Sequence, residues 1–132
     1  MYCMNGLREL QNGVNDVYDG LKKCCMGIKY IENCDKCRGL KCLEAGVMGM
    51  NEGLCELVNG LADVPKECNC EAVRMIEEGI CDMKEGIKHL EEGIEVISNG
   101  DVCCGLKHCE CGIKNANNGL CKCIEGIRNL RF

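Results

Sequence analysis

Apolar residues recur along this chain in a seven-residue pattern, and a glycine marks each repeat. Sixteen of the 17 glycines fall into four series with a spacing of seven residues, and only Gly49 lies outside them. The four series start at Gly6, Gly39, Gly79 and Gly105. An apolar residue usually follows each glycine at the first and fourth positions, as Leu40 and Leu43 follow Gly39. Because the apolar period is 3.5 residues and not two, the pattern predicts amphipathic helices rather than strands.

Four helices are predicted from the four glycine series, over residues 3–32, 38–63, 70–99 and 102–131. Residues 99–101, Asn-Gly-Asp, combine a glycine that can end one helix with an aspartate that can cap the next. Short connections make neighbouring helices antiparallel. The sequence therefore predicts an all-α protein, an antiparallel four-helix bundle that forms a single domain over residues 1–132.

The regular placement of glycine needs a physical reason, because glycine is a poor helix former. Each glycine inside a helix costs roughly 1 kcal/mol relative to alanine. Without a Cβ atom at these positions, two helix backbones can approach more closely than the usual separation of about 8–10 Å. We therefore expect the glycines to form a seam of close helix–helix packing.

The chain is a tandem repeat of a 66-residue helical hairpin. Residues 1–66 and 67–132 are identical at 21 of 66 aligned positions, and nearly all the glycines of the two halves coincide. The match is strongest around the hairpin tip, where residues 31–41 repeat as residues 97–107. Repeats of this kind bury their apolar faces against each other. We expect two hairpins related by a pseudo-twofold axis.

Charge and composition narrow the range of functions. The chain has 16 basic and 21 acidic residues, well mixed along its length, and its net charge is −5. Nucleic acids and anionic membranes require clustered Lys and Arg, so neither is an expected partner. The chain contains no run of about 18 apolar residues, so no membrane span is predicted. The N-terminal residues lack the basic start and apolar run of a signal peptide, so we expect synthesis in the cytoplasm without that signal.

Sixteen cysteines make up about an eighth of the chain, a level typical of disulfide scaffolds and metal–thiolate proteins. In an antiparallel bundle, nine of them fall near the hairpin tips and seven near the opposite end. The nine are Cys24, Cys25, Cys34, Cys37, Cys42, Cys103, Cys104, Cys109 and Cys111, and the seven are Cys3, Cys55, Cys68, Cys70, Cys81, Cys121 and Cys123. Such helices are about 40 Å long, and a disulfide needs Cα atoms within about 7 Å. Since both counts are odd, we expect at least one cysteine at each end to lack an intrachain partner.

The heptad also predicts which cysteines face outward. Seven fall at the outward positions b, c or f: Cys42, Cys55, Cys68, Cys81, Cys104, Cys111 and Cys121. Five fall at core positions: Cys3, Cys24, Cys34, Cys109 and Cys123. The cross-link candidates are the outward seven together with Cys70 and Cys123. We expect them to join copies of the chain through disulfides, since each bridge can stabilise a structure by roughly 2–4 kcal/mol.

Metal–thiolate binding is the alternative. Cys34-Asp-Lys-Cys37 is the only C-x-x-C motif, and further thiols and a histidine lie at the same end of the bundle. The candidate ligands for Cu(I) or Zn²⁺ are Cys34, Cys37, Cys103, Cys104, His108, Cys109 and Cys111, because thiolates favour these metals. One C-x-x-C is a weak signal, since a zinc ribbon needs two. His108 also fits a solvated helix residue, and the other histidine, His89, has no expected role.

No catalytic constellation is present in the sequence. A nucleophilic cysteine needs a nearby base, and the two histidines match no such pairing. There is no Glu-x-x-His motif of the kind that holds a di-iron centre. We expect a protein that is not an enzyme and needs no cofactor, unless its thiols bind copper or zinc.

The composition, rich in Cys, Lys, Asn, Ile and Gly, resembles that of cysteine-rich bacterial spore coat and exosporium proteins. This resemblance implies a structural protein that assembles with itself into a disulfide-linked filament or layer, deposited on the spore surface or released. The chain is also similar to the bacterial copper storage proteins, four-helix bundles that hold Cu(I) on core thiols. Their cysteines typically recur as C-x-x-x-C, whereas this chain has no pair at that spacing. We therefore expect a self-assembling homo-oligomer or polymer, with copper or zinc storage as the alternative.

Overall fold

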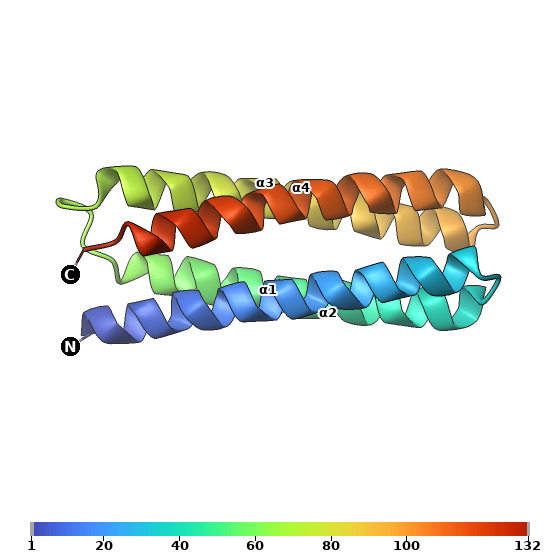
Figure 1. Ribbon diagram of the computed structural model, residues 1–132, viewed down its shortest axis with the longest axis horizontal. Helices are drawn as coiled ribbons and strands as arrows, with labels where there is room; N and C mark the ends of the chain where they lie inside the picture. Colours follow the sequence, from blue (N-terminus) through green and yellow to red (C-terminus); the bar gives the residue numbers. More distant parts are fainter. Residues whose placement is uncertain (1, 132) are drawn as a thin grey trace.

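The computed structural model describes residues 2–131 and, from Asn5 onward, their side chains. Four helices follow one another along the chain: α1 (Tyr2–Glu32), α2 (Lys36–Ala62), α3 (Cys70–Ser98) and α4 (Val102–Arg128). Both termini and the α2–α3 connection lie at one end of an elongated bundle, which we term the base end (Figure 1). The α1–α2 and α3–α4 turns lie at the other, the tip end (Figure 1). The prediction of an all-α, antiparallel four-helix bundle is confirmed.

Capping residues in the tip turns explain where the helices begin. Asp35 accepts a hydrogen bond from the N–H of Arg38, and Asp101 accepts one from the N–H of Cys104. Gly100 has a φ of 104°, a conformation that suits a residue without a Cβ atom. The expected helix boundaries differ from the observed ones by at most three residues. The largest difference is at the end of α4, where residues 129–131 leave the helix.

A glycine seam joins the two helices of each hairpin. Gly13 lies opposite Gly53, and a Cβ atom built on either glycine would stand 2.7 Å from the carbonyl oxygen of the other. The same reciprocal contact repeats along both hairpins. The other opposed pairs are Gly6–Gly60, Gly20–Gly46, Gly27–Gly39, Gly79–Gly119, Gly86–Gly112 and Gly93–Gly105. The two backbones of a hairpin are therefore in direct contact, as the sequence predicted.

One glycine of the seam faces an alanine. Gly126 lies opposite Ala72, which stands in the second hairpin where the first has Gly6. A Cβ atom built on Gly126 would be 2.9 Å from the carbonyl oxygen of Ala72. This end of the seam holds one methyl group, but its partner must still be glycine.

Larger side chains cover most glycines of the seam from the opposite helix, and they usually stand four residues after a glycine of their own. Met50 covers Gly20 in this way, and Leu57 covers Gly13. Met50 and Leu57 are fully buried. The residues directly after the glycines face the other hairpin, so that Leu61 on α2 and Ile80 on α3 line one shared groove. The seam thus builds each hairpin, and a separate apolar face joins the two hairpins.

We expect Gly20→Ala and Gly49→Ala to have opposite effects on stability. The new methyl group at position 20 would meet the carbonyl oxygen of Gly46 at 2.5 Å, so the helices must separate, at a cost of about 1–3 kcal/mol or more. Gly49 lies off the seam, and a Cβ atom there would be 3.7 Å from its nearest neighbour, the Cα atom of Gly20. Alanine at position 49 should therefore stabilise the helix by up to about 1 kcal/mol. Urea unfolding in the presence of a reductant measures both changes, and equal effects would contradict the seam.

Candidate functional site

The cysteines divide into a buried and a surface set. All fifteen whose side chains the structure describes are free thiols; Cys24, Cys109 and Cys123 are buried and the other twelve are exposed or half-buried. The seven surface thiols near the tip end, the tip belt, are Cys25, Cys34, Cys37, Cys42, Cys103, Cys104 and Cys111. The five near the base end, the base belt, are Cys55, Cys68, Cys70, Cys81 and Cys121. The predicted core position of Cys3 lies outside the described side chains.

The predicted outward positions agree with the observed exposure. Of the seven cysteines assigned to b, c or f, only Cys42 is half-buried and the rest are exposed. Cys68 precedes the start of α3 at Cys70, so its exposure follows from its place in the connection and not from the heptad. Cys70, the remaining surface candidate for a cross-link, is exposed as well. Oxidants and other chains can therefore reach these thiols without any unfolding of the helices.

The three buried thiols are packing residues of the seam. Each covers a glycine of the opposite helix, namely Gly46, Gly93 and Gly79 for Cys24, Cys109 and Cys123. Burial raises the pKa of the Cys24 and Cys123 thiols to about 12 and that of Cys109 to about 11. They remain protonated and unreactive at neutral pH, because the thiolate is the reactive form. Cys109, expected as a metal ligand, and Cys123, expected as a cross-link, do not reach the surface.

Cys34 is not a core residue, and this expectation was wrong. It is exposed in the α1–α2 turn, with a φ of 69°. The heptad frame assigns positions only inside a helix, and α1 ends two residues earlier, at Glu32. In the second hairpin the equivalent residue is Gly100, the residue type that this backbone conformation favours.

The two belts cannot form disulfides with each other inside one chain. Gly79 faces Gly119 across the seam, so Cys81 of the base belt lies level with residue 117 of α4. The tip-belt thiol nearest to that level on α4 is Cys111, six residues or about 9 Å away along the axis. A disulfide needs Cα atoms within about 7 Å. The tip belt holds seven thiols, an odd number, so at least one of them has no partner within its belt.

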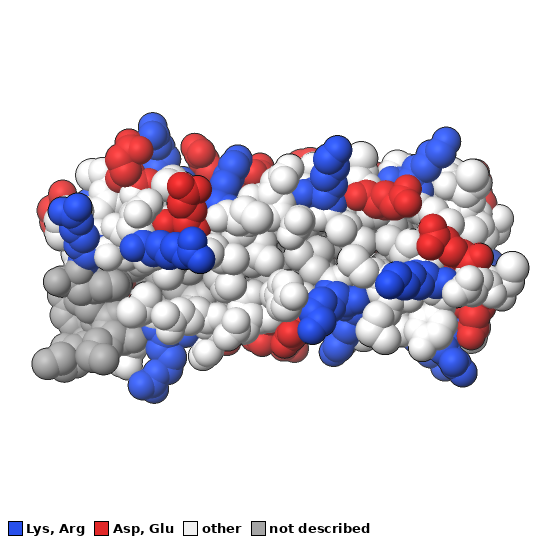
Figure 2. Space-filling view, viewed as in Figure 1, with Lys and Arg blue, Asp and Glu red and all other residues white. Residues whose placement is uncertain are grey.

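Three shallow grooves between the hairpins combine exposed apolar side chains with surface thiols. Tyr18, 53% exposed, and Cys25 line the groove between α1 and α4. Val58, 47% exposed, lies in the grooves between α2 and α3 with Cys81 and Cys55. Figure 2 shows the face that α1 and α4 form, where uncharged atoms fill much of the space between scattered charges of both signs. Both sides of the bundle therefore offer apolar contact next to a thiol.

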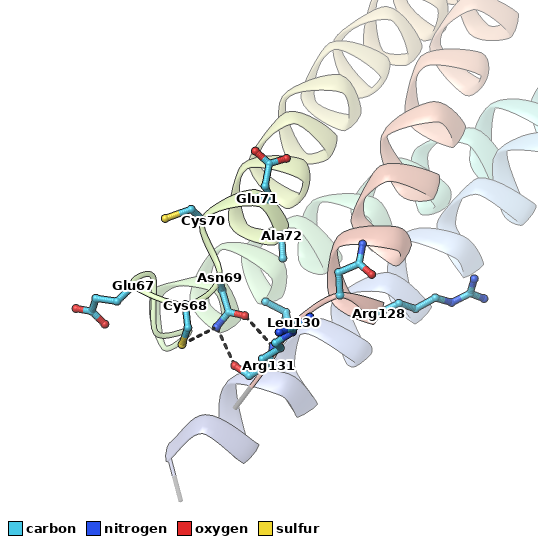
Figure 3. A pocket seen from close by; sticks show the side chains of 10 residues that line it. Glu67, Cys68, Asn69, Cys70, Glu71, Ala72, Arg128, Leu130 and Arg131 are labelled. Carbon is cyan, nitrogen blue, oxygen red and sulfur yellow. Dashed lines mark hydrogen bonds between the residues drawn. The ribbon is translucent and has the colours of Figure 1, made fainter.

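At the base end, Asn69 ties the C-terminal segment to the α2–α3 connection (Figure 3). Its buried side chain donates hydrogen bonds of 2.8 Å to the carbonyl oxygens of Pro65 and Arg131, and accepts one of 2.7 Å from the N–H of Arg131. The base-belt thiols Cys68 and Cys70 flank this residue and remain exposed. The Asn69 clamp thus fixes the backbone that carries two of the reactive thiols.

The two histidines meet on the second hairpin, a contact that the sequence analysis missed. The ring centroids of His89 on α3 and His108 on α4 are 6.4 Å apart, with 23° between the ring planes. Glu92, one turn after His89, places a carboxylate oxygen 3.9 Å from Nδ1 of His108. Nδ1 of His89 is buried without a hydrogen-bond partner. The glycine register could have indicated this contact, since each histidine lies midway between the same two opposed glycine pairs.

The cysteines named as alternative metal ligands do not gather into one site. Among the described side chains, the only group of three or more potential ligand atoms within 4.8 Å of one another is His89, Glu92 and His108. Of the ligands expected from the sequence, only His108 belongs to this group. The six expected cysteine ligands lie outside it: Cys34, Cys37, Cys103, Cys104, Cys109 and Cys111.

At one pair of equivalent positions, the second hairpin has an ion pair and the first has two acidic residues. In the second hairpin, Nζ of Lys122 lies 2.7 Å from a carboxylate oxygen of Asp82. The equivalent residues of the first hairpin are Glu56 and Asp16, two acids. A proton shared with Asp16, partial burial and nearby acids together raise the pKa of the Glu56 carboxyl to about 7. The first hairpin thus carries a repulsive contact where the second has an ion pair.

Comparisons with family models, with curated proteins and with solved structures found no match to this chain. Within the described residues, no helix has the length and apolar character needed to cross a membrane. Function must therefore follow from the arrangement of the thiols and of the histidine cluster.

Replacing Cys34 by glycine should stabilise the protein. A side chain at a φ of 69° costs about 1–2 kcal/mol, and glycine removes most of that cost. The matched change in the other turn, Gly100→Cys, should lower the free energy of unfolding by a similar amount. Thermal unfolding in a reductant measures both, and unchanged midpoints would show that neither turn is strained.

The Glu56→Lys variant should be more stable than the parent at pH 8, because it converts the acid pair into the ion pair of the second hairpin. The folded-state pKa of Glu56, about 7, lies above its usual value of 4.5, so the folded state binds more protons between these values. The stability that protonated Glu56 supplies is present below about pH 4.5 and lost as the pH rises to about 7. The stability of the variant should not fall over this pH range, and its free energy of unfolding at pH 8 should exceed that of the parent by up to about 1 kcal/mol.

Lys122→Glu is the matched control, since it gives the second hairpin the acid pair of the first. It should lower stability at pH 8 and introduce a loss of stability across the same pH range. Urea unfolding from pH 4 to pH 8 compares the three proteins. Parallel stability profiles for the parent and Glu56→Lys would refute the role assigned to Glu56.

Proposed function

We propose that this chain is a structural subunit that assembles with copies of itself and is cross-linked by disulfides between its surface thiols. The observation that carries the proposal is the distribution of these thiols. Twelve reach the surface in two belts that cannot pair with each other, and the tip belt holds an odd number. The tip end therefore keeps at least one thiol for another chain, and the exposed thiols of the base end are accessible to other chains as well.

The inter-hairpin grooves supply the contact that precedes a covalent bond. An exposed aromatic or branched side chain in the same groove as a thiol, as with Tyr18 and Cys25, allows a second chain to dock before the sulfurs react. Formation of each bridge removes two electrons and two protons from two thiols, and these pass to an oxidant such as oxygen or a small disulfide. On the face that α1 and α4 form, charged residues of both signs surround the groove, and they disfavour association through other parts of this surface.

Storage of Cu(I) on thiols receives less support from the geometry. A storage bundle needs thiols gathered in its core, and here the core thiols cover glycines singly along the seam. The surface thiols are spread over both ends and form no group of three within the described side chains. An assembly of cross-linked bundles is also the role implied by the compositional resemblance to spore coat and exosporium proteins, and we propose that setting for it.

Oxidation of the wild-type chain should produce a ladder of disulfide-linked species on a non-reducing gel, and a reductant should collapse this ladder to the monomer. Replacing all seven tip-belt cysteines by serine should reduce this ladder to small oligomers, because only the base end can then form disulfides. Serine at Cys3 and at all twelve belt positions should leave a monomer. Intact-mass measurement with thiol counting identifies each species.

The buried thiols provide the control for this experiment. Cys109→Ala removes a thiol that is fully buried, so polymer length should not change. A wild-type chain that stays monomeric with all its thiols reduced after exposure to oxidised glutathione would overturn the proposal. A ladder that persists in the variant without belt cysteines would do the same.

A further inference from the structure

We propose that His89, Glu92 and His108 form a binding site for one divalent transition-metal ion, such as Zn²⁺, on the outer side of the α3–α4 hairpin. The site uses no cysteine and does not depend on disulfide assembly. Of the ligands that the sequence predicts for a thiolate site, it includes only His108.

The geometry of the three side chains favours coordination. Their potential ligand atoms all lie within 4.8 Å of one another. In a tetrahedral zinc site the ligand atoms lie about 2.0–2.2 Å from the metal and therefore roughly 3.3–3.6 Å from one another. Side-chain rotations that move each ligand atom by about 1 Å would bring the three groups to these distances. His89 and Glu92 share one face of α3 at a spacing of three residues, and His108 faces them across the seam. Since the seam fixes α3 against α4, the ligands are held on a rigid frame.

Two details of the site are unusual for surface residues without a ligand. Nδ1 of His89 is shielded from solvent and makes no hydrogen bond, which leaves a lone pair or an N–H unsatisfied. The imidazole rings of the only two histidines in the chain also lie close together, with their centroids 6.4 Å apart. A metal ion held by both imidazoles would account for their approach, and one bound through Nδ1 of His89 would also give that nitrogen a partner.

The ligand set indicates the class of metal. Two neutral imidazoles and one carboxylate carry a net charge of −1, which suits a divalent ion, and imidazole nitrogen favours zinc, nickel, copper(II) or cobalt over magnesium and calcium. Three protein ligands leave a fourth position open, and Glu92 and His108 are exposed enough for solvent to occupy it.

The first hairpin has no such site and so provides an internal comparison. Its residues at the positions of His89, Glu92 and His108 are Lys23, Met26 and Cys42. Lysine and methionine bind divalent zinc or cobalt poorly, because one is protonated and the other is a soft thioether. We therefore expect one metal ion per chain and not two.

Cobalt and zinc titration of the full chain tests the site, after iodoacetamide has capped the surface thiols of the folded protein. The capped chain should bind one equivalent of Co²⁺, seen as visible absorption without a thiolate charge-transfer band, and Zn²⁺ should displace it. His89→Lys, which installs the residue of the first hairpin, should weaken binding by about tenfold or more, as should Glu92→Gln. Glu91→Gln is the matched control and should bind like the parent, because Glu91 lies outside the ligand cluster.

Circular dichroism of each variant shows whether it is folded, and His89→Gln replaces His89→Lys if the latter is not. Absence of stoichiometric binding by the capped parent would overturn the proposal. Equal affinities of the Glu92→Gln and Glu91→Gln variants would do so too. Neither result would affect the disulfide ladder, so the metal site and the assembly can fail separately.

Discussion

Direct contact between glycine backbones is the constraint on which the rest of this structure depends. Where two glycines oppose each other, the hydrogen in place of each Cβ points at the carbonyl oxygen of the other residue. Each such Cα–H···O contact is weak, roughly 0.5–1 kcal/mol, but the contacts are reciprocal and repeat every two turns. Together with the apolar side chains that cover each glycine, they offset the helix propensity that glycine lacks. The close approach also fixes the register, because a slip by one residue would place side chains against carbonyl groups.

This constraint decides where the remaining chemistry can lie. The seam consists of the glycines and of the side chains that cover them from the opposite helix. Only small or apolar residues fit at the covering positions. For this reason Cys24, Cys109 and Cys123 can replace larger residues there. Reactive thiols, histidines and charges are confined to the outer faces and the ends. The two hairpins share one frame but differ in this outer layer. An ion pair between Asp82 and Lys122 corresponds to two acids in the first hairpin, and only the second hairpin has the histidine cluster.

Most of the frame could be predicted from the sequence, because period, repeat and glycine spacing all depend on local structure. The outward thiols that lie inside the helices followed from the same heptad. Cys34 could not be placed by it, since a heptad position has no meaning beyond the last helical turn, where the chain enters a positive φ. The pairing of His89 with His108 needed the register between two helices, which the pattern of a single helix does not contain. That register was nevertheless available from the glycine series, because opposed glycines fix which residues lie level with each other.

The same division explains how a chain with so many thiols can fold while they are all reduced. Its helices are held by backbone contact and apolar burial, and no disulfide is required to bring them together. The thiols that do take part in the core are protected by burial, which raises their pKa and slows oxidation. Those on the surface lie at the ends of rigid helices, so oxidation can link folded units without rearranging them. Glycine in the seam therefore holds each hairpin together, and the surface cysteines are left free for the cross-links that we propose between chains.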